Sequence, residues 1–157
     1  MIFATVGTQL GFPRLIRALD DLAAQKGLRI VAQIGPDPGE YRALEVHGSL
    51  ASKDFARLVD QARVIVGHAG IGTILSAQAA GKPLILMPRR ADRGEHRNDH
   101  QTATTRAVAG RIGVHVAQDA DALRTLLTAP ALTPMRRDGP SLSRDALIGR
   151  LRELVEE

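Results

Sequence analysis

The sequence predicts an α/β fold, a doubly wound parallel sheet covered by helices on both faces, in a single domain over residues 1–157. Short apolar runs rich in β-branched residues alternate with segments whose apolar residues recur at helical spacing. The runs are apolar at consecutive positions, as strands buried on both faces are. A chain of 157 residues has room for one domain with a substantial core.

The first half of the expected sheet begins with the β-branched run 2–6, which ends in Gly7 as a strand entering a loop does. Pro13 suits the first turn of a helix, and apolar residues then recur at helical spacing until Gly27 ends the pattern. Residues 28–34 predict a second strand, which the turn residues 35–39 end. We expect a short third strand at 44–47.

The second half repeats this alternation. Ser52 is expected to cap a helix, and the apolar run 64–66 predicts the next strand. We then expect a loop, a helix over 73–80 that Gly81 ends, and a buried strand over 84–87. The remaining expected elements are a helix capped by Asn98 that runs to about residue 109, a strand at 112–116, a helix at 120–127 and a loop at 129–140.

Residues 141–157 are expected to form a C-terminal amphipathic helix. Its apolar residues fall on one face: Leu147, Ile148, Leu151, Leu154 and Val155. That face could pack on its own domain or dock a partner subunit, and the sequence leaves both open.

Composition narrows the function. The chain has no cysteine, which excludes disulfides, thiolate metal sites and cysteine nucleophiles. No apolar run reaches the roughly 18 residues that cross a bilayer, and the N-terminus lacks signal-peptide features, so we expect a cytoplasmic domain. The net charge of +4 comes from 18 Arg and 3 Lys against 17 acids, while aromatic residues make up only 3%. This favours a small anionic ligand or a membrane surface over nucleic acid.

Ligands of such sheets bind at the carboxyl ends of the strands, so three loops are candidates: 7–11, 68–73 and 89–101. In the middle loop, Gly70 and Gly72 precede a helix whose first turn holds Thr73. Free N–H groups and the helix dipole attract a phosphate there. The alternative is that these glycines only form a tight turn. Their spacing does not match the dinucleotide or Walker patterns, which argues against NAD and ATP.

Other polar residues have competing interpretations. His68 is an ordinary loop residue or, less favoured, an acid or base, and no metal-ligand spacing surrounds it. Asp119 and Asp121 match a short metal-binding pattern of some sugar transferases, but Asp119 suits a helix cap better. The third loop holds four arginines, two histidines and two amides, which can grasp hydroxyls and an anion; the alternative is a solvated charged loop.

Three stretches together resemble the C-terminal, nucleotide-sugar-binding domain of family 28 glycosyltransferases, which is half of a GT-B enzyme with a Rossmann-like fold. They are residues 62–75, residues 80–88 and Asn98-Asp99-His100-Gln101. The start of the chain, residues 1–9, resembles the free-standing form of that domain. That form is the catalytic subunit of two-part enzymes such as the eukaryotic lipid-linked N-acetylglucosaminyltransferase and bacterial exopolysaccharide glucuronosyltransferases.

The resemblance implies site residues. Those expected to bind the donor substrate are Gly7, Thr8, Gln9, His68, Gly70, Gly72, Thr73, Arg90, Arg93, His96, Asn98, Asp99, His100 and Gln101. Gly70, Gly72 and Thr73 would lie against a diphosphate, and His100 and Gln101 would reach the sugar. The chain departs from the family at Ser76, where an acid that holds ribose is usual, and at Thr104, where Asn is common.

The resemblance also implies partners and chemistry. We expect an inverting transfer from a UDP-sugar to a lipid-linked saccharide, without metal or other cofactor, and peripheral at the inner face of the plasma membrane. A membrane-associated acceptor-binding subunit would supply the base, with His68 a weaker candidate. Arg89, Arg90, Arg93 and Arg97 favour UDP-glucuronate as donor. UDP-N-acetylglucosamine, UDP-galactose, a non-catalytic accessory role and, least favoured, a nicotinamide-dependent enzyme remain alternatives.

Overall fold

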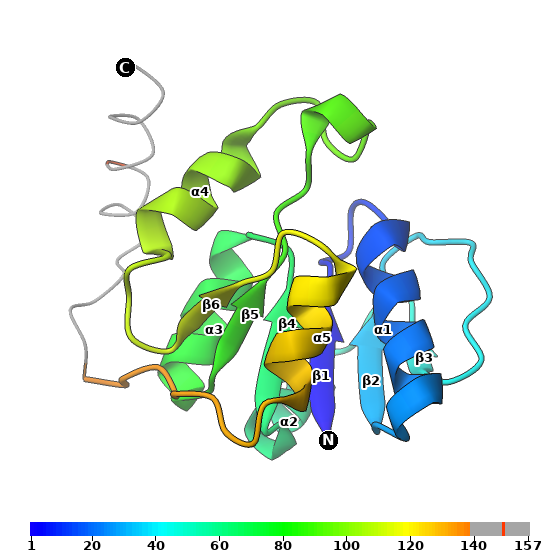
Figure 1. Ribbon diagram of the computed structural model, residues 1–157, viewed down its shortest axis with the longest axis horizontal. Coiled ribbons are helices and arrows are strands. Elements are labelled where there is room, and N and C mark those ends of the chain that lie inside the picture. Colours follow the sequence, from blue (N-terminus) through cyan, green and yellow to red (C-terminus); the bar gives the residue numbers. More distant parts are fainter. Residues whose placement is uncertain (139–148, 150–157) are drawn as a thin grey trace.

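In the computed structural model, which describes residues 1–138 and residue 149, six parallel strands form one sheet in the order β3-β2-β1-β4-β5-β6 (Figure 1). The strands are β1 (Ile2–Thr5), β2 (Ile30–Gln33), β3 (Glu45–His47), β4 (Val64–Gly67), β5 (Leu84–Leu86) and β6 (Val114–Val116). The helices are α1 (Pro13–Lys26), α2 (Ser52–Gln61), α3 (Ile71–Ala80), the 3-10 helix η1 (Ala91–Arg93), α4 (His100–Val108) and α5 (Ala120–Thr128). This confirms the predicted doubly wound fold.

The order of the strands places a crevice in the middle of the sheet. The chain starts at β1, moves outward through β2 and β3, and then returns to lay β4 on the other side of β1. Thr5, the last residue of β1, therefore pairs with Gln33 of β2 and with Gly67 of β4. The loops that follow β1 and β4 leave toward opposite faces of the sheet, which opens a crevice between them at the carboxyl ends of the strands.

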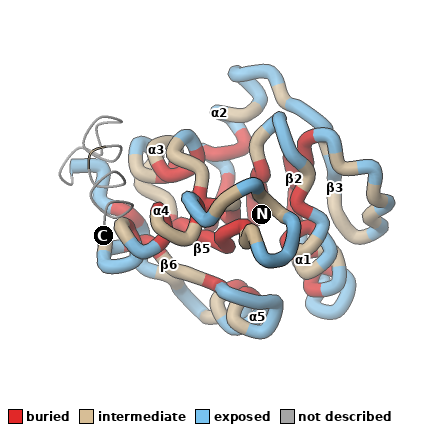
Figure 2. The backbone as a smooth tube through the Cα atoms, turned by 90° about the horizontal axis from the view of Figure 1, so that it is seen from above, coloured by how far each residue is buried: buried red, intermediate tan, exposed pale blue. Residues whose placement is uncertain are grey.

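Alternate residues of the strands face two separate cores. One face of the sheet, with Ile2, Ala4 and Val66 among its residues, packs against α1 and α5. The other, with Phe3 and Ile65, packs against α2 and α3 and against the end of α4. Figure 1 shows α1 and α5 together on one side of the sheet, and Figure 2 shows the buried strands between exposed outer surfaces. The fully apolar runs in the sequence follow from this burial on both faces.

Of the three N-terminal helix caps considered in the sequence, the structure confirms one. Asp119 caps α5 through its side chain, which accepts a hydrogen bond from the backbone N–H of Ala122 at 2.8 Å; this supports the cap interpretation over a metal motif. Ser52 does not cap α2: it is the first helical residue, after Ala51. Asn98 lies one residue too early to cap α4, which Asp99 precedes, although its carboxamide oxygen accepts from the N–H of His100.

Some boundaries also differ from the expectation. Helix α3 begins at Ile71, two residues before the expected start at Thr73. The last strand begins at Val114, because Gly113 takes a left-handed conformation (φ 84°) just before it and Ile112 is exposed. The loop after β5 contains the short helix η1, which no apolar periodicity signals. The C-terminal helix expected over 141–157 falls outside the described residues apart from position 149, and stays a prediction.

Candidate functional site

A pocket of about 560 Å³ opens at the crevice between β1 and β4. The loops after β1, β4 and β5 form its walls, and α2 and α3 contribute one side. Its lining residues are Thr5, Val6, Gly7, Thr8, Gln9, Leu10, Gln33, Phe55, His68, Gly70, Ile71, Gly72, Thr73, Ser76, Arg89, His96 and Gln101. The pocket thus unites nine of the residues predicted to bind substrate, from three loops far apart in the sequence.

The lining carries no carboxylate. Among the described residues that form it, the ionisable side chains are Arg89, His68 and His96. A pocket with a buried guanidinium and without acids has a positive potential, which low-dielectric walls strengthen. It is suited to an anionic ligand.

The N-terminus of α3 lies at the edge of the pocket. Gly70 precedes the helix without a side-chain cap, and the N–H groups of Ile71, Gly72 and Thr73 make no hydrogen bond within the described part of the chain. The Thr73 hydroxyl likewise has no partner among the described residues. A Cβ on Gly72 would meet no atom within 4 Å, so the missing side chain leaves open space in front of these amides. This is the geometry with which helix N-termini bind phosphate.

The other two glycines of this segment serve packing. A Cβ on Gly70 would come within 2.8 Å of Cε1 of His68 and closer still to Nε2. A Cβ on Gly67 would lie 2.9 Å from Cγ2 of Thr73 and 3.0 Å from the carbonyl oxygen of Thr5. Gly70 therefore makes room for the histidine ring, and Gly67 lets α3 approach the sheet.

His68 is held neutral inside the pocket wall. Burial and then the nearby charge of Arg89 lower the pKa of His68 to about 4. The Nδ1 atom lies 3.5 Å from the carbonyl oxygen of Thr5, which favours a proton on that nitrogen. With such a low pKa the imidazole is uncharged at neutral pH and is a weak base.

Gln101 and His96 form the wall that comes from the loop after β5. The carboxamide oxygen of Gln101 accepts a hydrogen bond of 3.0 Å from the backbone N–H of Arg89, while its nitrogen has no partner among the described residues. His96 contacts Asn98 through Nδ1, 3.0 Å from Oδ1. Both side chains lie where they can offer hydrogen bonds to a ligand in the pocket.

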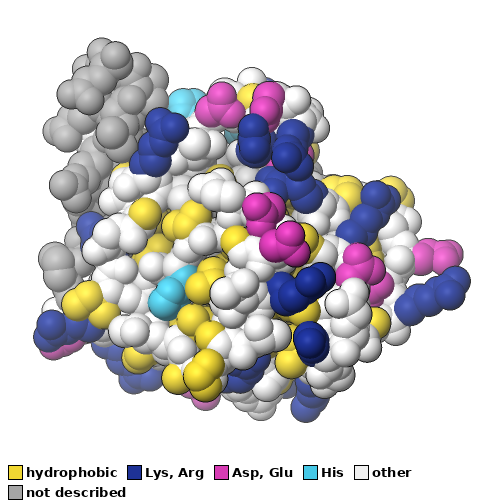
Figure 3. All heavy atoms as spheres, viewed as in Figure 1, with side chains coloured by type: hydrophobic (Ala, Val, Ile, Leu, Met, Phe, Trp, Pro, Cys, Tyr) yellow, Lys and Arg dark blue, Asp and Glu magenta, His cyan; other side chains and the backbone are white. Residues whose placement is uncertain are grey.

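The arginines of this loop are used differently from the expectation. Arg89 is 2% exposed, and its guanidinium donates to backbone carbonyls of the loop after β1, so it is not free to pair with a ligand carboxylate. Arg90 pairs with Asp92 through two contacts of 3.0 and 2.6 Å. Arg93 is exposed and lines no described pocket. Figure 3 shows Lys and Arg interspersed with Asp and Glu over this part of the surface instead of a continuous basic face.

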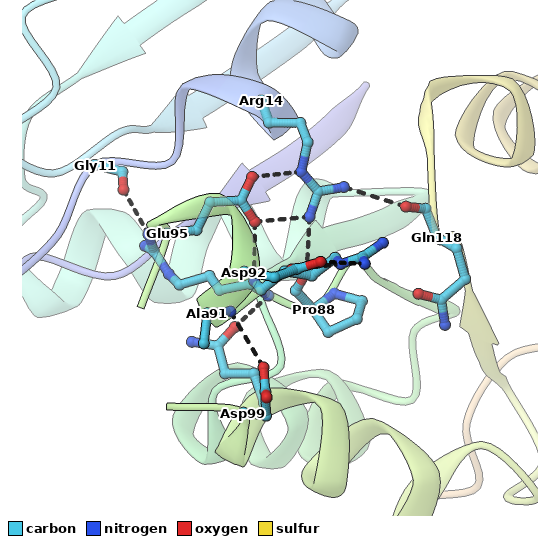
Figure 4. A network of polar contacts seen from close by, with 11 residues as sticks. Gly11, Arg14, Pro88, Ala91, Asp92, Glu95, Asp99 and Gln118 are labelled. Atoms are coloured by element: carbon cyan, nitrogen blue, oxygen red, sulfur yellow. Dashed lines mark hydrogen bonds and ion pairs between the residues drawn. The ribbon is translucent and has the colours of Figure 1, made fainter. Parts of the chain in front are cut away.

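A network of polar contacts fixes the loop to the start of α1 (Figure 4). Arg14 pairs with Glu95 through contacts of 2.5 and 2.9 Å, and it also donates to the carbonyl oxygens of Pro88 and Gln118. Glu95 accepts from the backbone N–H of Arg90 as well. Burial raises the pKa of Glu95, but the hydrogen bonds from Arg14 and from the Arg90 backbone outweigh it and hold the pKa below its ordinary value.

Four predicted site residues lie together elsewhere. Arg90, Asn98, Asp99 and His100 line a second hollow of about 930 Å³ between η1, α4 and the end of β6. Asp99 is used within the loop, where it accepts from the backbone N–H of Ala91 at 3.1 Å. The predicted residues are therefore divided: His96 and Gln101 reach the pocket, whereas these four do not line it.

Thr104 differs from the usual family residue, and its hydroxyl is occupied: it donates to the carbonyl oxygen of His100 within α4 at 2.9 Å. Sequence reasoning also missed four lining residues outside the candidate loops: Thr5, Val6, Gln33 and Phe55. Gln33 carried a signal, because an amide at the end of an otherwise apolar strand is unusual. Its nitrogen donates to the Thr5 hydroxyl at 3.3 Å. Phe55 gave none, because an apolar residue on an amphipathic helix indicates core packing.

Among the described residues, no group of three or more His, Asp or Glu side chains is arranged to hold a metal ion. No helix in the part of the chain that the structure describes is long and apolar enough to cross a membrane.

Comparison with protein families matches residues 1–133 to the glycosyltransferase family 28 C-terminal domain. Curated relatives carry the name UDP-N-acetylglucosamine--N-acetylmuramyl-(pentapeptide) pyrophosphoryl-undecaprenol N-acetylglucosamine transferase. The protein from Phenylobacterium zucineum is 33% identical over 74% of this chain and 34% of its own length. That from Bartonella henselae is 31% identical over 64% of this chain and 27% of its own. The chain thus spans about a quarter to a third of these relatives.

Solved structures share the fold at low sequence identity. MurG of Acinetobacter baumannii matches all of this chain with half of its own, at a TM-score of 0.66 and 19% identity. A kitacinnamycin glycosyltransferase matches 99% of this chain with 39% of its own, at a TM-score of 0.61 and 23% identity. The solution structure of ALG13 matches 99% of this chain with 96% of its own, at a TM-score of 0.59 and 18% identity.

Proposed function

The chain belongs to the family of glycosyltransferase family 28 C-terminal domains, and from this premise we propose that it is the donor-binding part of a two-part inverting glycosyltransferase. It takes a UDP-sugar and passes the sugar to a polyprenyl-diphosphate-linked acceptor. The observation that carries the proposal is the acid-free pocket at the sheet crevice, with the open N-terminus of α3 at its edge.

The chemistry needs negative charge to be stabilised. An acceptor hydroxyl attacks the anomeric carbon, the bond from that carbon to the diphosphate breaks, and UDP leaves with an additional negative charge on its terminal phosphate. The free N–H groups at α3 and the buried cation Arg89 favour that charge. Because they offset the diphosphate charge themselves, the proposal includes no metal cofactor.

Seven of the lining residues have assigned roles in this proposal. Gly72 and Thr73 lie against the diphosphate, and Thr8 and Gln9 approach it from the loop after β1. The free amide nitrogen of Gln101 serves the sugar hydroxyls, as does His96. Ser76, half-buried on α3, takes the place of the usual acid near the ribose with a single hydroxyl.

The base comes from elsewhere in this proposal. A histidine whose pKa lies near 4 accepts a proton poorly at neutral pH, so in this proposal His68 is not the base and contributes only to the wall of the pocket. We propose that a membrane-associated acceptor-binding subunit supplies the base and the lipid contact, at the inner face of the plasma membrane. The name of the curated relatives, which includes a lipid-linked acceptor, supports this part of the proposal.

UDP-glucuronate is the donor we favour, within exopolysaccharide assembly. A pocket without carboxylates does not repel a hexuronate, and Arg93 forms no ion pair with a described residue. UDP-N-acetylglucosamine is the second candidate, because the curated relatives carry that donor in their name. Because Arg90 is paired with Asp92 outside the pocket, exposed Arg93 is the arginine that we assign to the carboxylate, and Arg93→Ala should lower affinity for UDP-glucuronate far more than for UDP-glucose. Equal losses would contradict the assignment.

A non-catalytic accessory role is the alternative function, and Ser76 is the observation that favours it. Without an acid at this position, ribose is held by fewer hydrogen bonds. In that case the subunit would activate its partner without binding donor.

Calorimetric titration of the purified chain separates these proposals. UDP, UDP-glucuronate, UDP-glucose, UDP-N-acetylglucosamine and NAD are titrated without added metal, first into this chain and then into its complex with the partner. Binding of one UDP-sugar in preference to the others supports donor binding and identifies the sugar. Absence of nucleotide binding to the complex supports the accessory role, and binding of NAD alone contradicts both.

A further inference from the structure

Arg89 is a buried cation whose bonds go to one short loop. Its Nη2 donates to the carbonyl oxygens of Val6 and Leu10, at 3.2 and 2.8 Å, and its Nη1 donates to that of Gly11 at 2.5 Å. Its guanidinium carbon also lies 4.7 Å from the ring centre of Phe12. A residue in the loop after β5 therefore holds the loop that follows β1 in its shape.

The position of these carbonyls determines where the loop's N–H groups point. In a planar trans peptide the C=O and the following N–H point in opposite directions. The carbonyls of Val6, Leu10 and Gly11 point toward Arg89, so the N–H groups of Gly7, Gly11 and Phe12 point away from it, and the two ends of the loop are held in place. The N–H groups of residues 8–11 make no hydrogen bond within the described part of the chain, although three of these residues line the pocket. The loop thus presents free donors that an anion can use.

The charge of Arg89 has no carboxylate partner. No Asp or Glu in the described part of the chain forms an ion pair with it: Glu95 pairs with Arg14 and acts on Arg89 only from farther away, where its charge partly offsets the lowering of the Arg89 pKa by burial. Its acceptors are neutral carbonyls, and it lines the acid-free pocket. Its positive charge is therefore available to a ligand across a short, poorly solvated distance.

We propose that Arg89 is a positioning residue for the diphosphate of the ligand: it holds both ends of the loop after β1, keeps residues 8–10 in the conformation that leaves their amides free at the pocket, and adds a buried positive charge. This inference rests on the proposed donor-binding function. It assigns diphosphate recognition to one buried arginine rather than to the exposed arginines of the same loop.

The test compares ligands that differ by one phosphate. UDP and UMP are titrated into the wild-type chain, Arg89→Met, Arg89→Lys and the control Arg17→Met, which replaces an exposed arginine of α1. Arg89→Met should weaken UDP by about tenfold or more and UMP by about threefold or less, because the second phosphate uses the loop amides and the charge. Arg89→Lys should lie between, because lysine keeps the charge but lacks the fork that holds several carbonyls.

The result that would overturn the inference is an equal loss of UDP and UMP affinity, which a purely structural role produces, or no loss of either. If Arg89→Met fails to fold, Arg89→Lys decides by the same ratio. If the wild-type chain binds neither nucleotide, donor binding by the chain alone fails. NMR with inorganic pyrophosphate then tests Arg89 separately: shifts of the amides of residues 8–11 that weaken in Arg89→Lys support it, and their absence overturns it.

Discussion

The loop after β4 and the loop after β5 lie on either side of the same pocket, and they use their residues in opposite ways. The first, residues 68–73, consists of small or apolar residues apart from His68 and Thr73, and it leaves the N–H groups at the start of α3 without hydrogen bonds in the described part of the chain. The second, residues 89–99, is crowded with charge, yet most of that charge is paired inside the protein: Arg90 with Asp92, and Glu95 with Arg14. Under the proposed function, backbone amides and one buried guanidinium bind the anion in the pocket.

The difference teaches that the number of arginines in a loop does not measure its affinity for an anion. On the surface, the charge of Arg90 is already neutralised by Asp92, so little of it remains to attract a ligand. The three amides at the N-terminus of α3 have no hydrogen-bond partner in the described part of the chain, so they remain available to a ligand. The loop with no formal charge besides one neutral histidine is therefore the better anion site.

As the pH falls, the loop after β4 should be the first of the two loops to lose stability, because His68 becomes protonated. The pKa of His68 is about 4 in the folded protein and near 6.5 in the unfolded chain. Between these pH values the unfolded chain binds a proton at His68 and the folded protein does not. Stability is complete above pH 6.5 and falls as the pH drops from 6.5 to 4, by roughly 3 kcal/mol in total. Urea unfolding of wild type and His68→Gln at several pH values measures this. A slope in that window that persists in His68→Gln would contradict the account.

Gly70→Ala should cost about 2 kcal/mol of stability, because the new methyl group overlaps the His68 ring. Thermal or urea unfolding gives the value. Pairing the change with His68→Ala, which removes the ring, should recover part of the loss. If the double variant loses the full sum of the two single losses, the two residues do not interact.

In the loop after β5, Glu95→Gln should destabilise the protein by about 1–2 kcal/mol, because it removes the negative charge of the carboxylate that pairs with Arg14 through two contacts. The pKa of Glu95 is below its ordinary value of 4.5, so its contribution is present above that pH and is lost as the pH falls through the folded pKa. The two sides thus weaken in different pH windows. Asp21→Gln, at an exposed acid of α1, is the control.

Gly72→Ala should leave stability within about 0.5 kcal/mol of wild type, because its Cβ meets nothing and alanine favours helix. It should nevertheless lower UDP affinity by about tenfold or more, because the methyl group occupies the space in front of the α3 amides. Gly110→Ala is the matched control, since its Cβ also meets nothing and it lies beyond the end of α4. Unchanged UDP affinity in Gly72→Ala would place the anion elsewhere.

The smallest effect is expected for Arg90→Ala. Its guanidinium is exposed and paired with Asp92, so the unfolding midpoint should not move measurably. Affinity for UDP, which has no sugar, should also match wild type. A clear loss of UDP affinity would show that the second hollow takes part in diphosphate binding.

Several strands, one helix cap and one edge of the pocket could be predicted from the sequence, because the patterns that indicate them are local. Consecutive apolar residues at 64–66 and 84–86 gave buried strands, and Asp119 gave a helix cap. Gly70, Gly72 and Thr73, at the start of α3, predicted the edge of the pocket. Each of these depends on residues a few positions apart.

The remainder depends on contacts between distant segments. Nothing near Arg89 indicates that a loop about eighty residues earlier turns three carbonyls toward it and allows its burial. The division of the loop after β5 between two hollows likewise follows from the path that η1 gives the chain, which puts Gln101 in the pocket and His100 outside its lining. Spacing could place these residues on one loop but not on one side of it.

Backbone NMR of the chain titrated with UDP tests the central claim most directly, because it reports on both loops at once. The largest amide shifts should fall on residues 8–11 and on Ile71, Gly72 and Thr73, while Arg90, Arg93 and Asp99 stay near their free positions. Shifts concentrated on residues 90–99, with the start of α3 unchanged, would contradict the account and make the arginine loop the anion site.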